Sequence, residues 1–99
     1  MKVKVQSIHF DADRKLLDFV QEKVDKLTHF YESIIESEVF LRLDKDHDKG
    51  NKIAEIKVST PGRTLFAREQ CHSFEEATDH AVEAMRKQIT KYKEKVRGV

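Results

Sequence analysis

This chain of 99 residues has little cysteine, no tryptophan and no long apolar run. Cys71 is the sole cysteine, so no disulfide can form within the chain, which favours a reducing, cytoplasmic location. The N-terminal segment MKVKVQSIHF has no apolar run behind its lysines and predicts no secretory signal. Because no stretch approaches the roughly 20 apolar residues of a membrane-spanning helix, we expect no membrane partner.

Glycine and proline are also scarce, and no glycine-rich loop that could hold a nucleotide phosphate is present. The RNA-binding motifs of RRM and KH domains are absent as well. The histidines show no zinc-ligand spacing and have no second cysteine to join them. Cys71 and His72 are neighbours in an expected strand, so their side chains should point to opposite faces. We therefore expect no metal, no cofactor, no small-molecule substrate and no enzymatic activity.

One acidic stretch, DKDHDKGNKIAE, partly matches a calcium-binding loop. Asp44, Asp46, Asp48 and Glu55 occupy ligand positions of that template. However, Lys49 stands where the sharp turn needs glycine, and the flanking segments predict strands rather than helices. We interpret this stretch as a solvated hairpin tip.

The apolar residues follow both strand and helix periods. Alternating residues predict strands over 2–8, 37–45, 52–60 and 63–70. Asp13 is the expected N-cap of a first helix. Its apolar stripe consists of Leu16, Leu17, Phe19, Val20, Val24, Leu27, Phe30, Tyr31 and Ile34. Ser73 and Glu76 predict a capping box before a second helix. Its apolar arc consists of Phe74, Ala77, Ala81, Val82, Met85, Ile89, Tyr92 and Val96.

The expected order is β-α-β-β-β-α within one domain, residues 1–99. A strand–helix–strand unit implies a right-handed crossover and a parallel first pair. A polar loop at 46–51 and a type II turn at Pro61–Gly62 imply two antiparallel hairpins. Since each helix has one apolar side, the fold class is α+β, a four-stranded mixed sheet with two helices packed on one face. The face expected to meet water carries Lys4, Gln6, Arg42, Glu55, Lys57 and Arg68.

The second helix ends in an unusually basic segment. From Arg86 to Arg97, six basic residues stand against one acid, although the net charge of the chain is only +1. Lys87, Lys91 and Lys95 form a row in which each lysine follows the last by four residues. Cations near a helix C-terminus complement its dipole, but that benefit fades within the last turn, and lysines so spaced repel one another. A polyanion-binding surface explains the row, and a merely solvated face is the alternative.

The first helix adds further lysines. Lys23 and Lys26 lie at the edge of its apolar stripe. If the two helices lie side by side, their basic edges would form one continuous positive surface, which suits a polyanion such as RNA.

The whole chain resembles a known family. The element order, LLDFVQEKVDKLTHFY and SFEEATDHAVEAMRKQITKYKEKV together resemble the ribosome hibernation-promoting factors, also called ribosome-associated inhibitors or sigma-54 modulation proteins. The most specific part, RKQITKYKEK, is similar to the family's Arg-Gln-x-x-Lys-x-x-x-Lys pattern at Lys87, Gln88, Lys91 and Lys95. Lys87 replaces the arginine, which keeps the charge but loses the planar fork of donors.

The resemblance implies binding of ribosomal RNA in the mRNA/tRNA channel of the small ribosomal subunit, which inhibits translation by occupancy. It marks as RNA contacts first Lys26, Lys87 and Lys91, and then Lys23, Arg86 and Lys95. Because the chain stops at Val99, we expect the short form of the family, without a C-terminal dimerisation domain. Self-association and pairing of ribosomes are left open.

Two other functions stay open at this point. A general double-stranded RNA-binding domain has the order α-β-β-β-α, which lies within the order expected here. Competition with bulk duplex RNA would separate it from a ribosome-specific factor. A small α+β enzyme or ligand-binding module would need a pocket with catalytic groups, and the sequence shows no such cluster.

Overall fold

The computed structural model describes residues 2–45 and 50–96 and confirms the expected order of elements. The elements are β1 (Lys2–Ser7), α1 (Arg14–Phe30), β2 (Glu36–Leu43), β3 (Lys52–Thr60), β4 (Arg63–Cys71) and α2 (Phe74–Val96). The third strand matches its predicted bounds, and the other strands differ from theirs by one or two residues.

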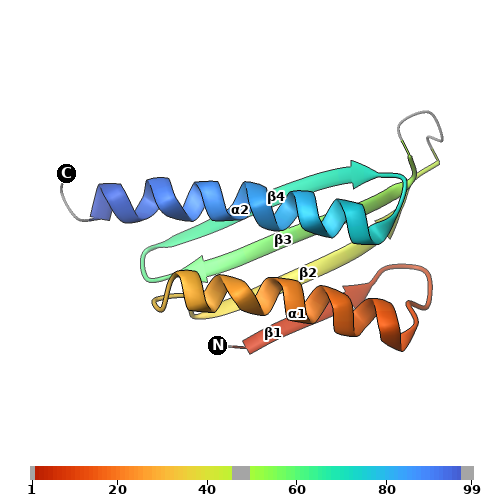
Figure 1. Ribbon diagram of the computed structural model, residues 1–99, viewed down its shortest axis with the longest axis horizontal. Coiled ribbons are helices and arrows are strands. Elements are labelled where there is room, and N and C mark those ends of the chain that lie inside the picture. The colour runs from red at the N-terminus through yellow and green to blue at the C-terminus, as the bar shows by residue number, and fades with distance from the viewer. Residues whose placement is uncertain (1, 46–49, 97–99) are drawn as a thin grey trace.

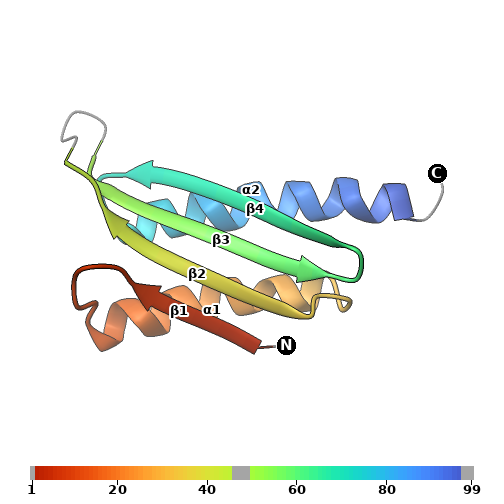
Figure 2. The ribbon, with the colours of Figure 1, turned by 180° about the vertical axis from the view of Figure 1, so that it is seen from behind.

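The strands form one sheet in the order β1-β2-β3-β4. β1 pairs with β2 in parallel, and the two following pairs are antiparallel, as the connections predicted. Both helices cover the same face of this sheet (Figure 1), and the opposite face is open (Figure 2). The α+β fold with two helices on one face is therefore confirmed.

The core lies between the sheet and the two helices. The register places Val39 opposite Val5 on one side and Ile56 on the other, and Ile56 opposite Ala67, so one apolar row crosses the sheet. The fully buried apolar side chains of the core are Val20, Val24, Val39, Leu41, Ala54, Ile56, Val58, Ala77, Ala81, Met85 and Ile89. Each element thus buries the face that its apolar period predicted.

The structure confirms the predicted start of α1 but not its predicted end. The Leu16 backbone N–H donates to Asp13 Oδ1 at 2.8 Å, so the predicted N-cap is confirmed. The helix stops at Phe30, however, and the inclusion of Tyr31 and Ile34 in the helical stripe was wrong, because Tyr31 is extended with φ −147°. Both residues still pack against the core, which is why their spacing imitated a continuing helix.

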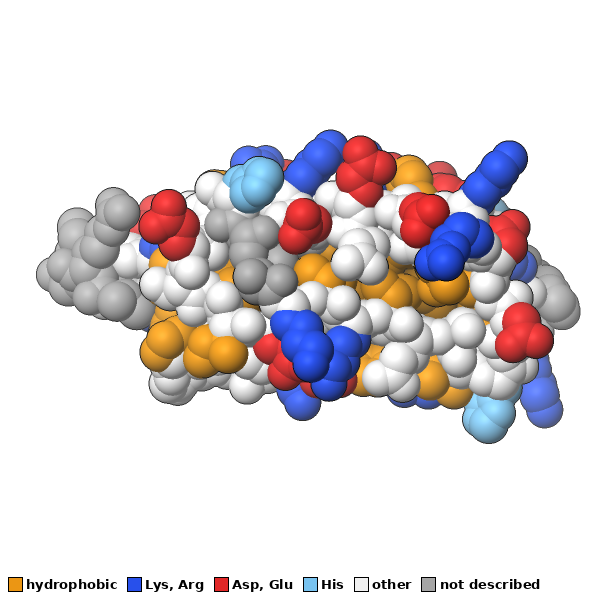
Figure 3. Space-filling view, turned by 90° about the horizontal axis from the view of Figure 1, so that it is seen from below, with side chains coloured by type: hydrophobic (Ala, Val, Ile, Leu, Met, Phe, Trp, Pro, Cys, Tyr) orange, Lys and Arg blue, Asp and Glu red, His pale blue; other side chains and the backbone are white. Residues whose placement is uncertain are grey.

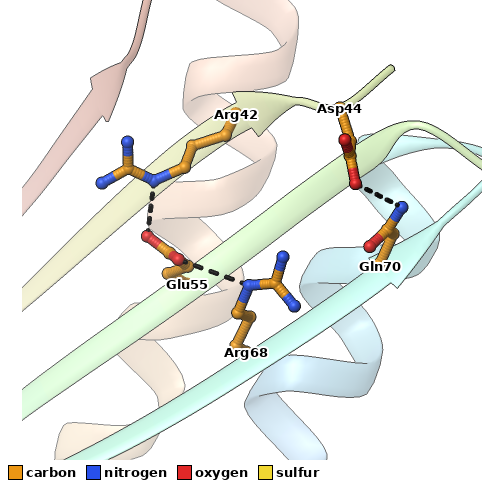
Figure 4. Close-up of polar contacts among 5 residues, drawn as sticks. All are labelled: Arg42, Asp44, Glu55, Arg68 and Gln70. Carbon is orange, nitrogen blue, oxygen red and sulfur yellow. Dashed lines mark hydrogen bonds and ion pairs between the residues drawn. The ribbon is translucent and has the colours of Figure 1, made fainter. Parts of the chain in front are cut away.

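A small polar cluster fixes the β2–β3 hairpin to β4 (Figure 4). Gln70 Nε2 donates to Asp44 Oδ2 at 3.1 Å and to the Gly50 carbonyl oxygen at 2.9 Å. The Asp44 N–H donates to the Asn51 carbonyl oxygen at 2.8 Å, which closes the base of the hairpin. The calcium-loop residues Asp46, Asp48 and Lys49 lie outside the described residues, so the interpretation of the tip stays a prediction.

The predicted turn and capping box are only partly tested. Gly62 has φ 85°, the conformation that the third position of a type II turn requires. The Glu76 N–H donates to Ser73 Oγ at 3.1 Å, so the serine half of the capping box is present. In the described parts of the chain, neither helix is long and apolar enough to cross a membrane.

Candidate nucleic-acid interface

The two helices run in the same direction, so their C-terminal ends lie at the same end of the molecule (Figure 1). Contacts between them agree: Lys23 of α1 pairs with Asp79 near the start of α2, at 3.2 Å between Nζ and Oδ1. At the other end, Lys93 Nζ donates to the Phe30 carbonyl oxygen at 3.3 Å. The basic half of α2 therefore lies beside the last turns of α1.

Lys93 has a structural role that the sequence did not reveal. Its ammonium group lies at the C-terminal end of α1, where it donates to a backbone carbonyl. It is 4.8 Å from the centre of the Phe30 ring and 5.7 Å from that of the Tyr31 ring. A cation is favourable at a helix C-terminus, and aromatic faces attract it further. One charge of the basic segment thus stabilises the end of a neighbouring helix.

Two of the predicted RNA-binding residues, Lys23 and Arg86, already have partners. Lys23 pairs with Asp79, as described above. Arg86 donates to Glu83 through Nη2 at 2.7 Å and through Nε at 3.2 Å. This bond holds the pKa of Glu83 below its usual range and raises the pKa of Arg86. Exposed pairs of this kind contribute little to stability because water and salt screen them, so a phosphate could replace either carboxylate.

The other four predicted residues are Lys26, Lys87, Lys91 and Lys95. All are exposed, and none has an ion pair within residues 2–45 and 50–96. Lys87 and Lys91 line a shallow groove on the outward side of α2, together with Arg86 and Thr90 and with the acidic Glu83 and Glu94. The structure thus exposes Lys87, Lys91 and Lys95 on α2, and none of them forms an ion pair with Glu83 or Glu94.

Lys26 stands apart from this row. It lies on α1, whereas the row of Lys87, Lys91 and Lys95 lies on α2. Viewed from the side of α1 and β1, the surface shows basic and acidic side chains interspersed, with apolar side chains between them (Figure 3). The continuous positive surface expected across both helices stays a prediction.

A second hollow lies next to the shallow groove, where α2 meets the start of β4, and Lys91 lines both. It measures about 150 Å³ and is lined by Arg63, Leu65, Gln88, Lys91, Tyr92 and Lys95. The sequence analysis missed Arg63, because its approach to α2 depends on the register of the β3–β4 hairpin. Its position directly after the Pro61–Gly62 turn was the one available signal.

On the open face of the sheet, two arginines share one carboxylate. Glu55 accepts from Arg42 Nε at 2.7 Å, and its other oxygen lies 3.5 Å from Arg68 Nε (Figure 4). Lys4 pairs with Glu36 at 3.3 Å on the same sheet. Arg42, Arg68 and Lys4 of the strands are therefore already paired with carboxylates, unlike Lys87, Lys91 and Lys95 of α2.

Within residues 2–45 and 50–96, Cys71 and the histidines show no catalytic arrangement. Cys71 is buried and His72 exposed, so these neighbours do point to different sides. Cys71 Sγ lies 3.6 Å from His80 Nδ1, but burial raises the pKa of the thiol and the Glu76 carboxylate raises it further. Among the described residues, no group of three or more histidine, cysteine or acidic side chains could hold a metal ion.

Comparison with known proteins shows which family the chain belongs to. A family model described as sigma 54 modulation protein / S30EA ribosomal protein matches residues 3–97. The chain belongs to the S30EA family. A curated relative of this S30EA chain is the ribosome hibernation promoting factor of Pseudomonas putida, 24% identical over 95 residues that cover 96% of this chain and 89% of the relative.

Solved structures share the S30EA fold. A ribosomal subunit interface protein from Coxiella burnetii has a TM-score of 0.83 at 20% identity, over 94% of this chain and 98% of its own. The N-terminal domain of Protein Y from Thermus thermophilus has a TM-score of 0.73 at 23% identity, over 92% and 94% of the two chains. At such identities these structures support the fold alone, and the family model supports the membership.

Proposed function

We propose that this protein binds the small ribosomal subunit and inhibits translation by occupying the channel for mRNA and tRNA. It would hold ribosomal RNA phosphates with the outward side of α2, chiefly Lys87, Lys91 and Lys95, helped by Lys26, Lys23 and Arg86. Its action would need no chemistry and would take place in the cytoplasm, where ribosomes work. Family membership and the P. putida relative's name support this proposal.

The observation that carries the proposal is the exposed lysine row of α2. Placing like charges four residues apart on a helix costs a few tenths of a kcal/mol per pair, and no acid among the described residues offsets it through an ion pair. RNA phosphates would repay this cost, since each contact releases counterions.

The test replaces Lys87, Lys91 and Lys95 together by glutamine. We expect the folded variant to keep nearly the same melting temperature, because lost dipole complementarity is offset by relieved repulsion. Its affinity for purified small subunits should fall sharply. The slope of log affinity against log salt should flatten by roughly 0.7–0.9 for each lost phosphate contact.

A matched variant controls for net charge. Lys2, Lys15 and Lys57 are exposed and, within the described ranges, carry no ion pair, so replacing them by glutamine removes the same charge from elsewhere. This control should bind small subunits almost normally and inhibit translation in a cell-free assay. Equal affinities and salt slopes for both triple variants would show that α2 is not the binding surface.

A further inference from the structure

The hollow between α2 and the start of β4 gathers three cations from distant parts of the sequence. Arg63 comes from β4, while Lys91 and Lys95 come from α2, and the remaining lining consists of Leu65, Gln88 and Tyr92. No described carboxylate lines it, and none of the three cations forms an ion pair with a described acid. Charges brought together in this way repel one another unless an anion joins them.

Neutral contacts hold the walls of this hollow in place. The Tyr92 hydroxyl donates to the Pro61 carbonyl oxygen at 2.8 Å, which ties α2 to the β3–β4 turn. Gln88 Nε2 donates to the Phe66 carbonyl oxygen at 2.7 Å, which ties the helix to β4. The Arg63 guanidinium lies 6.0 Å from the centre of the Tyr92 ring, within the range of a cation–π contact. The three cations therefore extend from elements that hydrogen bonds hold together.

The chemistry of the hollow suits a phosphate group. An arginine offers a planar fork of donors that matches two phosphate oxygens, and lysines add point charges around the same anion. The space of about 150 Å³ is well above the roughly 10–15 Å³ that a single water molecule needs. It is open to one side, so a phosphate within a chain could enter without its neighbours being buried.

We infer that this hollow is a phosphate-binding site, in which Arg63 is the forked ligand and Lys91 and Lys95 complete the charge. The phosphate belongs to the RNA backbone if the proposed function holds, and in that respect the inference rests on it. The site extends the binding surface from α2 onto the β3–β4 hairpin. A free phosphorylated molecule offers the same chemistry, so the experiment has separate arms for the two sources.

The first arm needs no ribosome. Inorganic phosphate is titrated into the isolated protein at constant ionic strength, with chloride as the balancing salt, and backbone amide shifts are followed by NMR. We expect shifts concentrated at Arg63, Gln88 and Lys91, which vanish in Arg63→Gln and weaken in Arg63→Lys. Arg68→Gln serves as the control, because it removes an arginine from the same strand but from the open face. Shifts spread over all surface lysines, or unchanged in Arg63→Gln, would overturn the inference.

The second arm measures affinity for small ribosomal subunits as a function of salt. Arg63→Gln should lower the affinity about tenfold and flatten the salt slope by roughly 0.7–0.9, while Arg68→Gln changes neither. Wild-type binding with no effect of Arg63→Gln would overturn the site and leave the proposed function intact. Absence of binding by the wild type, with phosphate shifts that still depend on Arg63, would overturn the proposed function and assign the site to a free phosphorylated molecule.

Discussion

Thr78 is a buried polar residue on the apolar side of α2. Its side chain is fully buried, and Oγ1 has no hydrogen-bond partner among the described residues. A buried hydroxyl without a partner costs about 1–3 kcal/mol of desolvation. Thr78→Val keeps the shape and removes this polar atom, so we expect the free energy of unfolding to rise by about 1 kcal/mol. Thermal denaturation should show a melting temperature about 4–8 °C higher.

Thr90→Val is the control for this substitution. Thr90 lies on the same helix but is exposed, and its Oγ1 donates to the Arg86 carbonyl oxygen at 2.9 Å. The same change there should bring no gain in melting temperature. A stabilisation of equal size at both positions would mean that valine acts through the helix backbone and not through the lost hydroxyl.

At the scale of elements, the β2–β3 hairpin depends on one glycine. Gly50 has φ 85°, and a Cβ at this position would lie 2.3 Å from the carbonyl carbon and oxygen of Cys71. Those are backbone atoms of β4, so no side-chain rotation could relieve the clash. We expect Gly50→Ala to lower the free energy of unfolding by about 2–3 kcal/mol and the melting temperature by about 10–20 °C.

Gly62 provides a closely matched comparison. It has the same φ of 85°, but a Cβ there would meet no atom within 4 Å. Gly62→Ala should therefore cost only the strain of the left-handed conformation, about 1 kcal/mol. If the two variants melted at the same temperature, the close approach of the hairpin to β4 would not contribute to stability.

The apolar periodicity of strands and helices also explains how much of the fold could be predicted from the sequence. Alternation gave the strands, and helical spacing together with Asp13 and Ser73 gave the helix starts, because these signals are local. The end of α1 was misjudged, since Tyr31 packs against the core while half-buried and in an extended conformation. Local patterns therefore predicted which elements form better than they predicted where the first helix ends.

At the scale of the whole molecule, the charge is distributed unevenly. The net charge is +1 and the isoelectric point about 7.9, yet residues 84–96 hold five basic side chains and one acid. We expect the protein to be retained by a cation-exchange resin at pH 8, where its net charge is close to zero. The Lys87, Lys91 and Lys95 triple variant should elute at clearly lower salt than the matched Lys2, Lys15 and Lys57 variant. Identical elution would mean that net charge alone governs retention.

The candidate site was predictable only where it lies on one element. The row of Lys87, Lys91 and Lys95 follows from helical spacing, and the structure presents it as one exposed side. The contribution of Arg63 depends on a hairpin meeting a helix, and the ion pair of Lys23 depends on a partner in the other helix. Contacts between elements that are far apart in sequence produce no local sequence pattern, so they could not be predicted.

The hydrogen bond from Gln88 to the Phe66 carbonyl oxygen also affects how copies of the protein could associate. β4 is an outer strand, and unpaired backbone groups along an outer strand are a template for polymerisation. Gln88 occupies one of these groups on β4, while the opposite outer strand, β1, carries Lys2 and Lys4. Each of these two features discourages sheets from joining edge to edge into fibrils.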